Sequence, residues 1–246
     1  MLEDWRQAAK EYSQELGETG DFLRLSTINP FILSRLGKVS GRKILDLGCG
    51  EGYLSRLLIS SGDWQYTGVD FCQELLDEAK SKNSPGDFFC ADITRPLDIL
   101  DKNFDVVMAN MVAMDVAEIG GLYQNAFDKL KSSGLFFNIL AHPAFSRPAA
   151  RLFKTWKEKI LRRDPFVRVD IYGPVGSQRS KILGLKKPTV IFFRPLAAYV
   201  QPGIDLGFEL VELAELAPSS TAIEEYHYPK FWTKHPKVLA LVFRKK

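Results

Sequence analysis

The residues in this chain best suited to chemistry are three aspartates and a glycine-rich segment. Residues 46–52 read Asp-Leu-Gly-Cys-Gly-Glu-Gly at the end of a short apolar run, and Asp70 and Asp92 stand at the ends of two further runs. Glycines at such a turn let the backbone approach a ligand that lies over the carboxyl ends of strands. A tight turn without a ligand would use the same glycines, so the glycine spacing alone does not show that a ligand binds there.

The acids indicate which ligand the turn would hold. Asp70 lies roughly 20 residues after Gly48, where a carboxylate can accept both ribose hydroxyls, and Asp92 could accept from an adenine amino group. With Asp46 they bring three carboxylates to one crevice, which repels a pyrophosphate and favours a cation such as a sulfonium with an ammonium group. A dinucleotide fingerprint would need glycine at Tyr53. Each acid alone could instead cap a helix.

The elements around these residues alternate between short apolar runs and helical segments. The runs expected to be strands are 43–47, 66–70, 87–91, 104–109 and 135–140. The helical segments between them lie near 53–60, 73–80 and 121–131. This alternation implies parallel crossovers, so we expect an α/β fold with an open, doubly wound, mostly parallel sheet. Two late strands, 208–213 and 238–243, would complete the sheet.

The whole chain, 1–246, is expected to form a single domain with four parts. These are an N-terminal helical cover (1–39), a core (40–142), an inserted lid (143–197) and the C-terminal strands (198–246). In the cover, apolar residues at three- and four-residue spacing predict a helix over 2–16. In the lid, the same spacing predicts an amphipathic helix over 148–163, and runs 166–172 and 190–193 are expected to form a hairpin.

The lid segment is strongly basic. It holds thirteen Lys or Arg against three acids, whereas the rest of the chain has a net charge of −7. The helix could have a solvated basic face, cover an acidic small molecule, lie on an anionic membrane or bind RNA phosphates. We expect no DNA, and the aromatic residues argue against RNA because they share the apolar face rather than the basic one.

At the residues described above, the sequence resembles the class I methyltransferases, the Rossmann-like family that uses S-adenosylmethionine. Residues 44–52 match that family's glycine-rich first motif, Asp70 its ribose acid, and Asp92-Ile93 its adenine-contacting pair. Residues 104–110 match its fourth strand, and 130–135 the turn before its fifth. The resemblance implies a seven-stranded sheet and S-adenosylmethionine as the cofactor.

The flanks more loosely resemble the small-molecule branch of that family. Trp5 and Tyr12 match its N-terminal helix, where the tyrosine commonly reaches the methionine carboxylate, and Arg24 would do the same. Arg194-Pro195-Leu196 also matches, but Phe193 stands where relatives often have a histidine. The residues expected to bind the cofactor are Tyr12, Arg24, Asp46, Gly48, Cys49, Gly50, Asp70, Phe71, Asp92, Ile93, Asn110 and Met111. Met114 and Arg194 are expected to contact the substrate.

An oxygen acceptor would also need a base, and His142 is the predicted one. It is one of three histidines and follows the fifth strand, where the pocket should open. The alternative is that His142 caps a turn or orders the lid. The acids after the fourth strand, Asp115 and Glu118, are too few to suggest a metal site. An Asn/Asp-Pro-Pro-Tyr motif is absent there, which argues against base or glutamine nitrogens as acceptors.

Composition sets the remaining expectations. No stretch of about 18 apolar residues occurs, the first residues resemble no signal peptide, and three cysteines in no zinc-like spacing suggest reduced thiols in a cytoplasmic protein. We therefore predict a methyltransferase that uses S-adenosylmethionine to methylate an O or N atom of a small, acidic or apolar metabolite. The alternatives are a membrane-associated lipid or quinone methyltransferase, and a non-catalytic protein that binds the cofactor.

Overall fold

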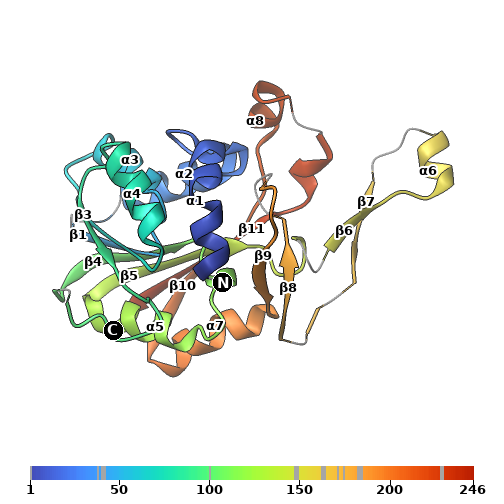
Figure 1. Ribbon diagram of the computed structural model, residues 1–246. Helices are drawn as coiled ribbons and strands as arrows, with labels where there is room; N and C mark the ends of the chain where they lie inside the picture. The colour runs from blue at the N-terminus through green and yellow to red at the C-terminus, as the bar shows by residue number, and fades with distance from the viewer. Residues whose placement is uncertain are drawn as a thin grey trace.

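The computed structural model describes residues 2–37, 39, 43–99, 101–146, 150–161, 165–170, 172–173, 175–181, 185–227 and 230–246. Its centre is a seven-stranded sheet (Figure 1). The strands of this sheet are β1 (Lys43–Leu47), β2 (Gln65–Asp70), β3 (Asp87–Cys90), β4 (Phe104–Asn110), β5 (Leu130–Ala141), β10 (Phe208–Leu216) and β11 (Val238–Lys245). Their spatial order is β10-β11-β5-β4-β1-β2-β3.

Strand direction confirms the expected doubly wound, mostly parallel sheet. The five strands from β3 to β5 pair in parallel, and β11 runs antiparallel to both β5 and β10. Every residue of β4 is buried, as is every residue of β1 after Lys43. Continuous burial is expected for central parallel strands that helices cover on both faces. The carboxyl ends of β1, β2 and β4 therefore open at one edge.

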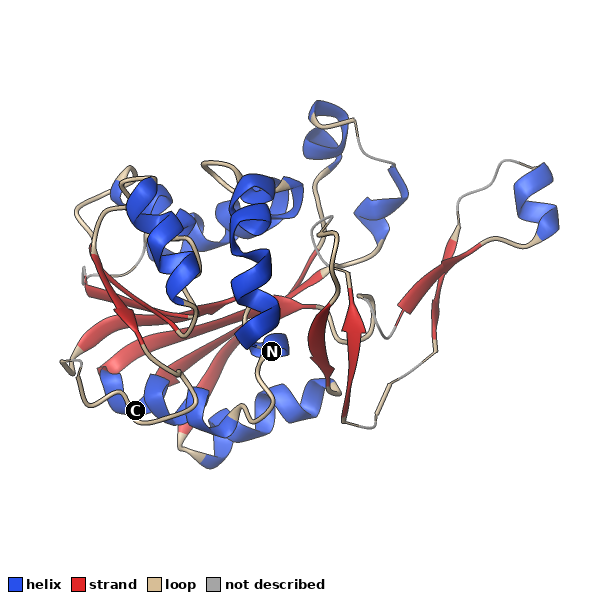
Figure 2. Cartoon of the chain, viewed as in Figure 1, coloured by secondary structure: helices blue, strands red, loops and turns tan. Residues whose placement is uncertain are grey.

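Helices cover both faces of the sheet (Figure 2). On one face lie α1 (Leu2–Leu16), the π-helix η1 (Arg24–Ile28), α2 (Asn29–Leu36), α3 (Tyr53–Ile59) and α4 (Gln73–Ser81). On the other lie α5 (Gly120–Lys129) and α7 (Leu196–Asp205). The short elements are η2 (Ala113–Asp115), α6 (Trp156–Ile160), α8 (Ser220–Glu225) and η3 (Lys230–Lys234). Each face has its own buried cluster, with Ile32 and Leu54 in one and Leu122 and Tyr123 in the other.

The predicted helix over 148–163 is wrong for most of its length. Residues 150–153 form the strand β6 (Ala150–Phe153), which pairs antiparallel with β7 (Phe166–Val169), and only α6 is helical. Residues 148–149 and 162–163 lie outside the described residues. Residues 150–153 have the apolar spacing of a helix, but they pair with the alternating run in β7. Pairing with a strand partner outweighs the local periodicity of the sequence.

The expected hairpin between 166–172 and 190–193 is also wrong. The run at 190–193 belongs to β9 (Thr189–Phe193), which pairs with β8 (Gly176–Ser180) instead. The β8–β9 hairpin is bound to α1 by two side-chain contacts. Arg179 Nη2 lies 2.6 Å from Asp4 Oδ1. Lys187 Nζ donates to Gln7 Oε1 at 2.9 Å. Because α1 crosses the carboxyl ends of the strands, the hairpin is held beside the same edge of the sheet.

Candidate active site

Two cavities lie side by side at the carboxyl ends of the central strands. The first, about 660 Å³ including space open to solvent, is lined by the glycine-rich turn and by the ends of β2, β3 and β4. The second, about 980 Å³ on the same basis, extends from η1 past the end of β5 to the β8–β9 hairpin. Four residues line both cavities and form the wall between them: Trp5, Tyr12, Met111 and Asp115.

The glycine-rich turn has the backbone that its sequence indicates. Gly48 and Gly50 have φ of +79° and +55°, a region that side chains other than glycine rarely adopt. A Cβ on Gly48 would lie 2.4 Å from Cγ2 of Val112, which follows β4. The turn therefore packs against the β4 loop as closely as a glycine permits, and both glycines line the first cavity.

Asp70 at the end of β2 is held in place by two backbone donors. Its Oδ2 accepts from Gly50 N and its Oδ1 from Cys72 N, both at 2.9 Å. The side chain is buried yet lines the first cavity, and burial raises the pKa of Asp70 to about 6. Asp92, after β3, lines the same cavity, and its Oδ1 accepts from Thr94 N and Oγ1.

Nine of the twelve residues predicted to bind the cofactor line the first cavity: Tyr12, Gly48, Gly50, Asp70, Phe71, Asp92, Ile93, Asn110 and Met111. Asp46 and Cys49 line neither of the two cavities, so the structure gives no support for a direct contact from them. Asp46 lies beneath the turn, where Tyr66 Oη donates to its Oδ2 at 2.6 Å, and burial raises the pKa of Asp46 to about 7.

Arg24, the remaining predicted cofactor residue, lines the second cavity and reaches the shared wall. Its Nη2 donates to Tyr12 Oη at 3.0 Å, and its Nη1 donates to Asp21 Oδ2 at 3.2 Å. The guanidinium lies 5.2 Å from the ring centre of Tyr53, and its buried Nε has no hydrogen-bond partner among the described residues. The side chain is thus a fixed, buried cation beside the first cavity.

Arg194 and Met114, the predicted substrate residues, both line the second cavity. The Arg194 guanidinium, however, donates to three backbone carbonyls of the η2 loop: Ala113 at 3.5 Å, Val116 at 2.6 Å, and Ala117. Most of its hydrogen-bonding capacity is therefore used to hold that loop. Arg194 can contribute its charge to the cavity, but its donors are directed at the chain itself.

His142 lines the second cavity with both ring nitrogens engaged. Nδ1 accepts from Ala144 N at 3.1 Å and Phe145 N at 3.3 Å, which places the ring proton on Nε2, and Nε2 lies 2.8 Å from Glu215 Oε1. To act as a base, the imidazole would have to release both backbone donors. This geometry favours the alternative that His142 caps the turn after β5, although its role as a base remains a prediction.

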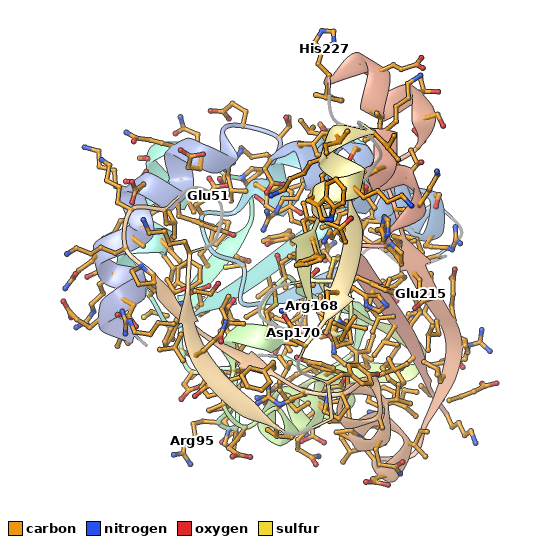
Figure 3. The ribbon with its side chains drawn as sticks, turned by 90° about the vertical axis from the view of Figure 1, so that its right-hand side faces the viewer. Glu51, Arg95, Arg168, Asp170, Glu215 and His227 are labelled. Atoms are coloured by element: carbon orange, nitrogen blue, oxygen red, sulfur yellow. The ribbon has the colours of Figure 1, made fainter. Side chains whose placement is uncertain are left out.

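Several residues around the cavities were not predicted. Trp5 packs edge-on against Tyr12, with ring centroids 5.2 Å apart, and their helical spacing indicates that they share a face. Phe192 and Tyr199 line the second cavity from β9 and α7. No binding or catalytic role was predicted for Asp115. His227 lies well away from the cavities, on the protruding segment that begins with α8 (Figure 3).

The comparisons with known proteins agree with this geometry. A family model described as a methyltransferase domain matches residues 45–138. The chain therefore contains a methyltransferase domain, and its sheet has the class I methyltransferase fold. A solved S-adenosylmethionine-dependent methyltransferase from Mesorhizobium loti shares this methyltransferase fold, with a TM-score of 0.74 and 21% identity over 93% of this chain and 100% of that one.

Two curated relatives have names that indicate a substrate or a pathway. A malonyl-[acyl-carrier protein] O-methyltransferase of Acetivibrio thermocellus is 33% identical over 42% of this chain, and a ubiquinone biosynthesis O-methyltransferase of Idiomarina loihiensis is 32% identical over 49%. The matches span 37% and 53% of the lengths of these relatives. The similarity to these two relatives therefore covers about half or less of each protein.

The first cavity fits the family's cofactor, S-adenosylmethionine. Its described lining includes Asp70, Asp92 and Asp115 but no Lys or Arg, so it favours a cation over a diphosphate. Asn110 Oδ1, buried in the same lining, has no hydrogen-bond partner among the described residues. The glycine turn leaves room for a ligand beside Asp70. Asp70 would accept from the ribose, Asp92 from the adenine, and Arg24 with Tyr12 would hold the methionine carboxylate.

No group of three or more His, Cys, Asp or Glu side chains in the described part of the chain is arranged to hold a metal ion. None of the described helices is both long enough and apolar enough to cross a membrane.

Proposed function

We propose that this methyltransferase transfers the methyl group of S-adenosylmethionine to an O or N atom of a small metabolite held in the second cavity. The observation that carries this proposal is the shared wall of Trp5, Tyr12, Met111 and Asp115. A cofactor in one cavity and an acceptor in the other would meet there. Methyl transfer needs that close approach, because alignment of the reacting atoms can supply ~7–11 kcal/mol of the barrier.

The lining of the second cavity indicates an acceptor with an apolar body and a polar or acidic group. Phe192, Phe193 and Tyr199 provide apolar surface, whereas Arg24 and Arg194 provide positive charge. The cofactor supplies an activated methyl group. The chain's own residues position the acceptor and exclude water, and the β8–β9 hairpin contributes by covering that side of the cavity.

The proposal is tested by transfer of a radioactive methyl group from S-adenosylmethionine to a heat-treated whole extract of the cells that encode the protein, which is then separated into small-molecule, protein and RNA fractions. We expect label in the small-molecule fraction with native protein and none with heat-denatured protein. Label found only in the protein or RNA fraction would contradict the proposed substrate class. Chromatography of the labelled product would then show whether the acceptor is acidic.

A second candidate function is methylation of an acceptor held in a membrane, such as a lipid or quinone. The observation that favours it is the arm formed by β6, α6 and β7, which projects away from the sheet (Figure 1). The arm exposes Trp156 to 74% and Ile160 to 67%, beside the exposed Lys157 and Lys159. Exposed aromatic and aliphatic side chains next to cations are typical of surfaces that bind anionic lipid. The quinone-related name of one relative supports the same class of acceptor.

We expect the wild-type protein to sediment with vesicles of phosphatidylglycerol and phosphatidylcholine at low salt, and less at high salt. Trp156→Ser with Ile160→Ser should lower the bound fraction at least about threefold, because both remove exposed apolar area. Ile99→Ser is the matched control, since Ile99 is 64% exposed elsewhere on the surface. Equal binding by all three proteins would exclude the arm as a lipid contact.

A further inference from the structure

Asp115 has an unusual position for an acidic side chain. It ends the 3-10 helix η2 directly after β4, and it is the only carboxylate in the wall between the two cavities as the structure describes them. The side chain is 9% exposed, and its Oδ1 has no hydrogen-bond partner among the described residues. A buried carboxylate oxygen without a partner costs free energy, so this one is available for a ligand.

Two features of the chain hold Asp115 at this wall. Its backbone N donates to Val112 O at 2.8 Å, which closes the η2 turn. Arg194 then binds the carbonyls of Ala113, Val116 and Ala117, on both sides of Asp115. A buried guanidinium thus fixes the loop that presents the carboxylate. Arg194 therefore acts as a positioning residue for Asp115.

The surroundings of Asp115 control its charge. The charged and titratable groups that face it are Arg24 from η1, Asp70 at the end of β2, Tyr12 from α1 and Tyr199 from α7. Burial raises the pKa of Asp115 to about 8, with a smaller contribution from Asp70 in the same direction, opposed by Arg24. A positively charged ligand in the first cavity lowers this pKa again and favours the carboxylate.

We propose that Asp115 is the catalytic residue that binds the acceptor's O–H or N–H group and takes its proton during methyl transfer. This inference rests on the proposed function. A lone pair of the acceptor forms the new bond to the methyl carbon, and the electron pair of the broken carbon–sulfur bond stays on sulfur. The acceptor's proton passes to the carboxylate of Asp115. Binding of the cationic cofactor prepares this step by ionising the carboxyl group.

Asp115 suits this role better than His142 does. Both nitrogens of His142 are engaged, with Ala144 N, Phe145 N and Glu215 Oε1. His142 lines only the second cavity, whereas Asp115 lines both. A base must reach the acceptor at the point where the acceptor meets the methyl group, and among the titratable residues described at the wall only Asp115 and Tyr12 do so. Tyr12 already accepts from Arg24 at 3.0 Å.

The position of Asp115 can be tested without knowing the acceptor. Sinefungin carries a primary amine where the cofactor carries its methyl-sulfonium, and S-adenosylhomocysteine carries a neutral thioether. We expect Asp115→Asn to weaken sinefungin binding about tenfold in titration calorimetry, since a charged hydrogen bond is lost. The affinity for S-adenosylhomocysteine should change less than twofold. Glu118→Gln, an exposed acid three residues along, should change neither. Equal effects on both ligands, or no effect on either, would overturn the placement.

The rate of methyl transfer provides a second test. In the labelled-extract assay, Asp115→Asn should lower the initial rate of transfer about 10²–10⁴-fold, as loss of a general base does, and His142→Gln should lower it less. A rate within threefold of wild type would overturn the catalytic role. If the wild-type protein labels no small molecule, the proposed function fails. In that case the proposed role of Asp115 as a base is withdrawn. The titration with sinefungin still shows whether Asp115 faces the reacting position.

Discussion

Asp70→Ala is expected to weaken binding of S-adenosylmethionine at least about 100-fold while the fold persists. The Asp70 carboxylate lines the first cavity and is aligned by the N–H groups of Gly50 and Cys72. Hydrogen bonds to a charged group contribute ~1.5–3 kcal/mol each, and the ribose offers two hydroxyls. Loss of both bonds corresponds to about 3 kcal/mol or more, which is roughly two orders of magnitude in affinity.

Titration calorimetry with S-adenosylmethionine measures this effect directly, and circular dichroism checks the fold. Asp77→Ala is the matched control, because Asp77 is an exposed acid on the neighbouring helix α4. An affinity for Asp70→Ala within fivefold of the wild type would show that Asp70 does not bind the ribose.

The pH profile of the wild-type protein gives an independent readout of the same residue. Burial raises the pKa of Asp70 to about 6 in the free protein, and a cationic ligand binds the ionised form more tightly. Affinity should therefore rise as pH increases through about 6, and a second rise up to about pH 8 is expected from Asp115, whose pKa the cationic ligand also lowers. Asp70→Asn should flatten this part of the profile. A profile unchanged in Asp70→Asn would assign the titration to another group.

The sheet and the cofactor cavity could be predicted because both depend on local sequence. Apolar runs separated by helical segments determine a parallel sheet, and parallel strands place their carboxyl ends at one edge. The positions of Asp70 and Asp92 at the ends of β2 and β3 follow directly. The glycine turn adds a second local signal, since Gly48 and Gly50 both have positive φ.

The second cavity could not be predicted to the same extent because its residues are paired across long sequence distances. The predicted substrate residue Arg194 binds carbonyls of the η2 loop, and the predicted base His142 lies against Glu215. Neither the pairing of Arg194 with these carbonyls nor the pairing of His142 with Glu215 can be recognised from a periodic pattern in the sequence. Asp115 was missed for a related reason: its importance comes from burial between two cavities, which only the packed structure shows.

The segment 143–197, predicted to be a lid, shows the same limit for secondary structure. Residues 150–153 have apolar spacing that suits a helix, yet they pair with β7. The β8–β9 hairpin is held against α1 by Arg179 and Asp4, which are distant in sequence. Pairing of this kind is decided by the tertiary fold, so periodicity within one segment could not reveal it.

The glycine-rich turn is also held by an ion-pair network that joins three helices. Glu51, buried to 1% exposure, lies 2.9 Å from Arg56 Nη2 on α3 and 2.9 Å from Lys82 Nζ at the end of α4. Lys82 Nζ also donates to Ser13 O and Gly17 O, at 2.9 Å each, at the end of α1. Figure 3 shows Glu51 beside the helices of the N-terminal cover.

Glu51→Ala is therefore expected to lower the free energy of unfolding by about 3–5 kcal/mol, because it leaves two largely buried cations without their carboxylate. For a chain of this size the melting temperature should fall by roughly 10 °C, measured by scanning calorimetry. Glu18→Ala is the matched control, since Glu18 lies 3.5 Å from the same Arg56 but is 74% exposed. Its removal should cost less than about 1 kcal/mol, as exposed ion pairs do. Equal decreases in the free energy of unfolding for the two variants would mean that burial of Glu51 does not strengthen its ion pairs. The turn would then be held by its backbone alone.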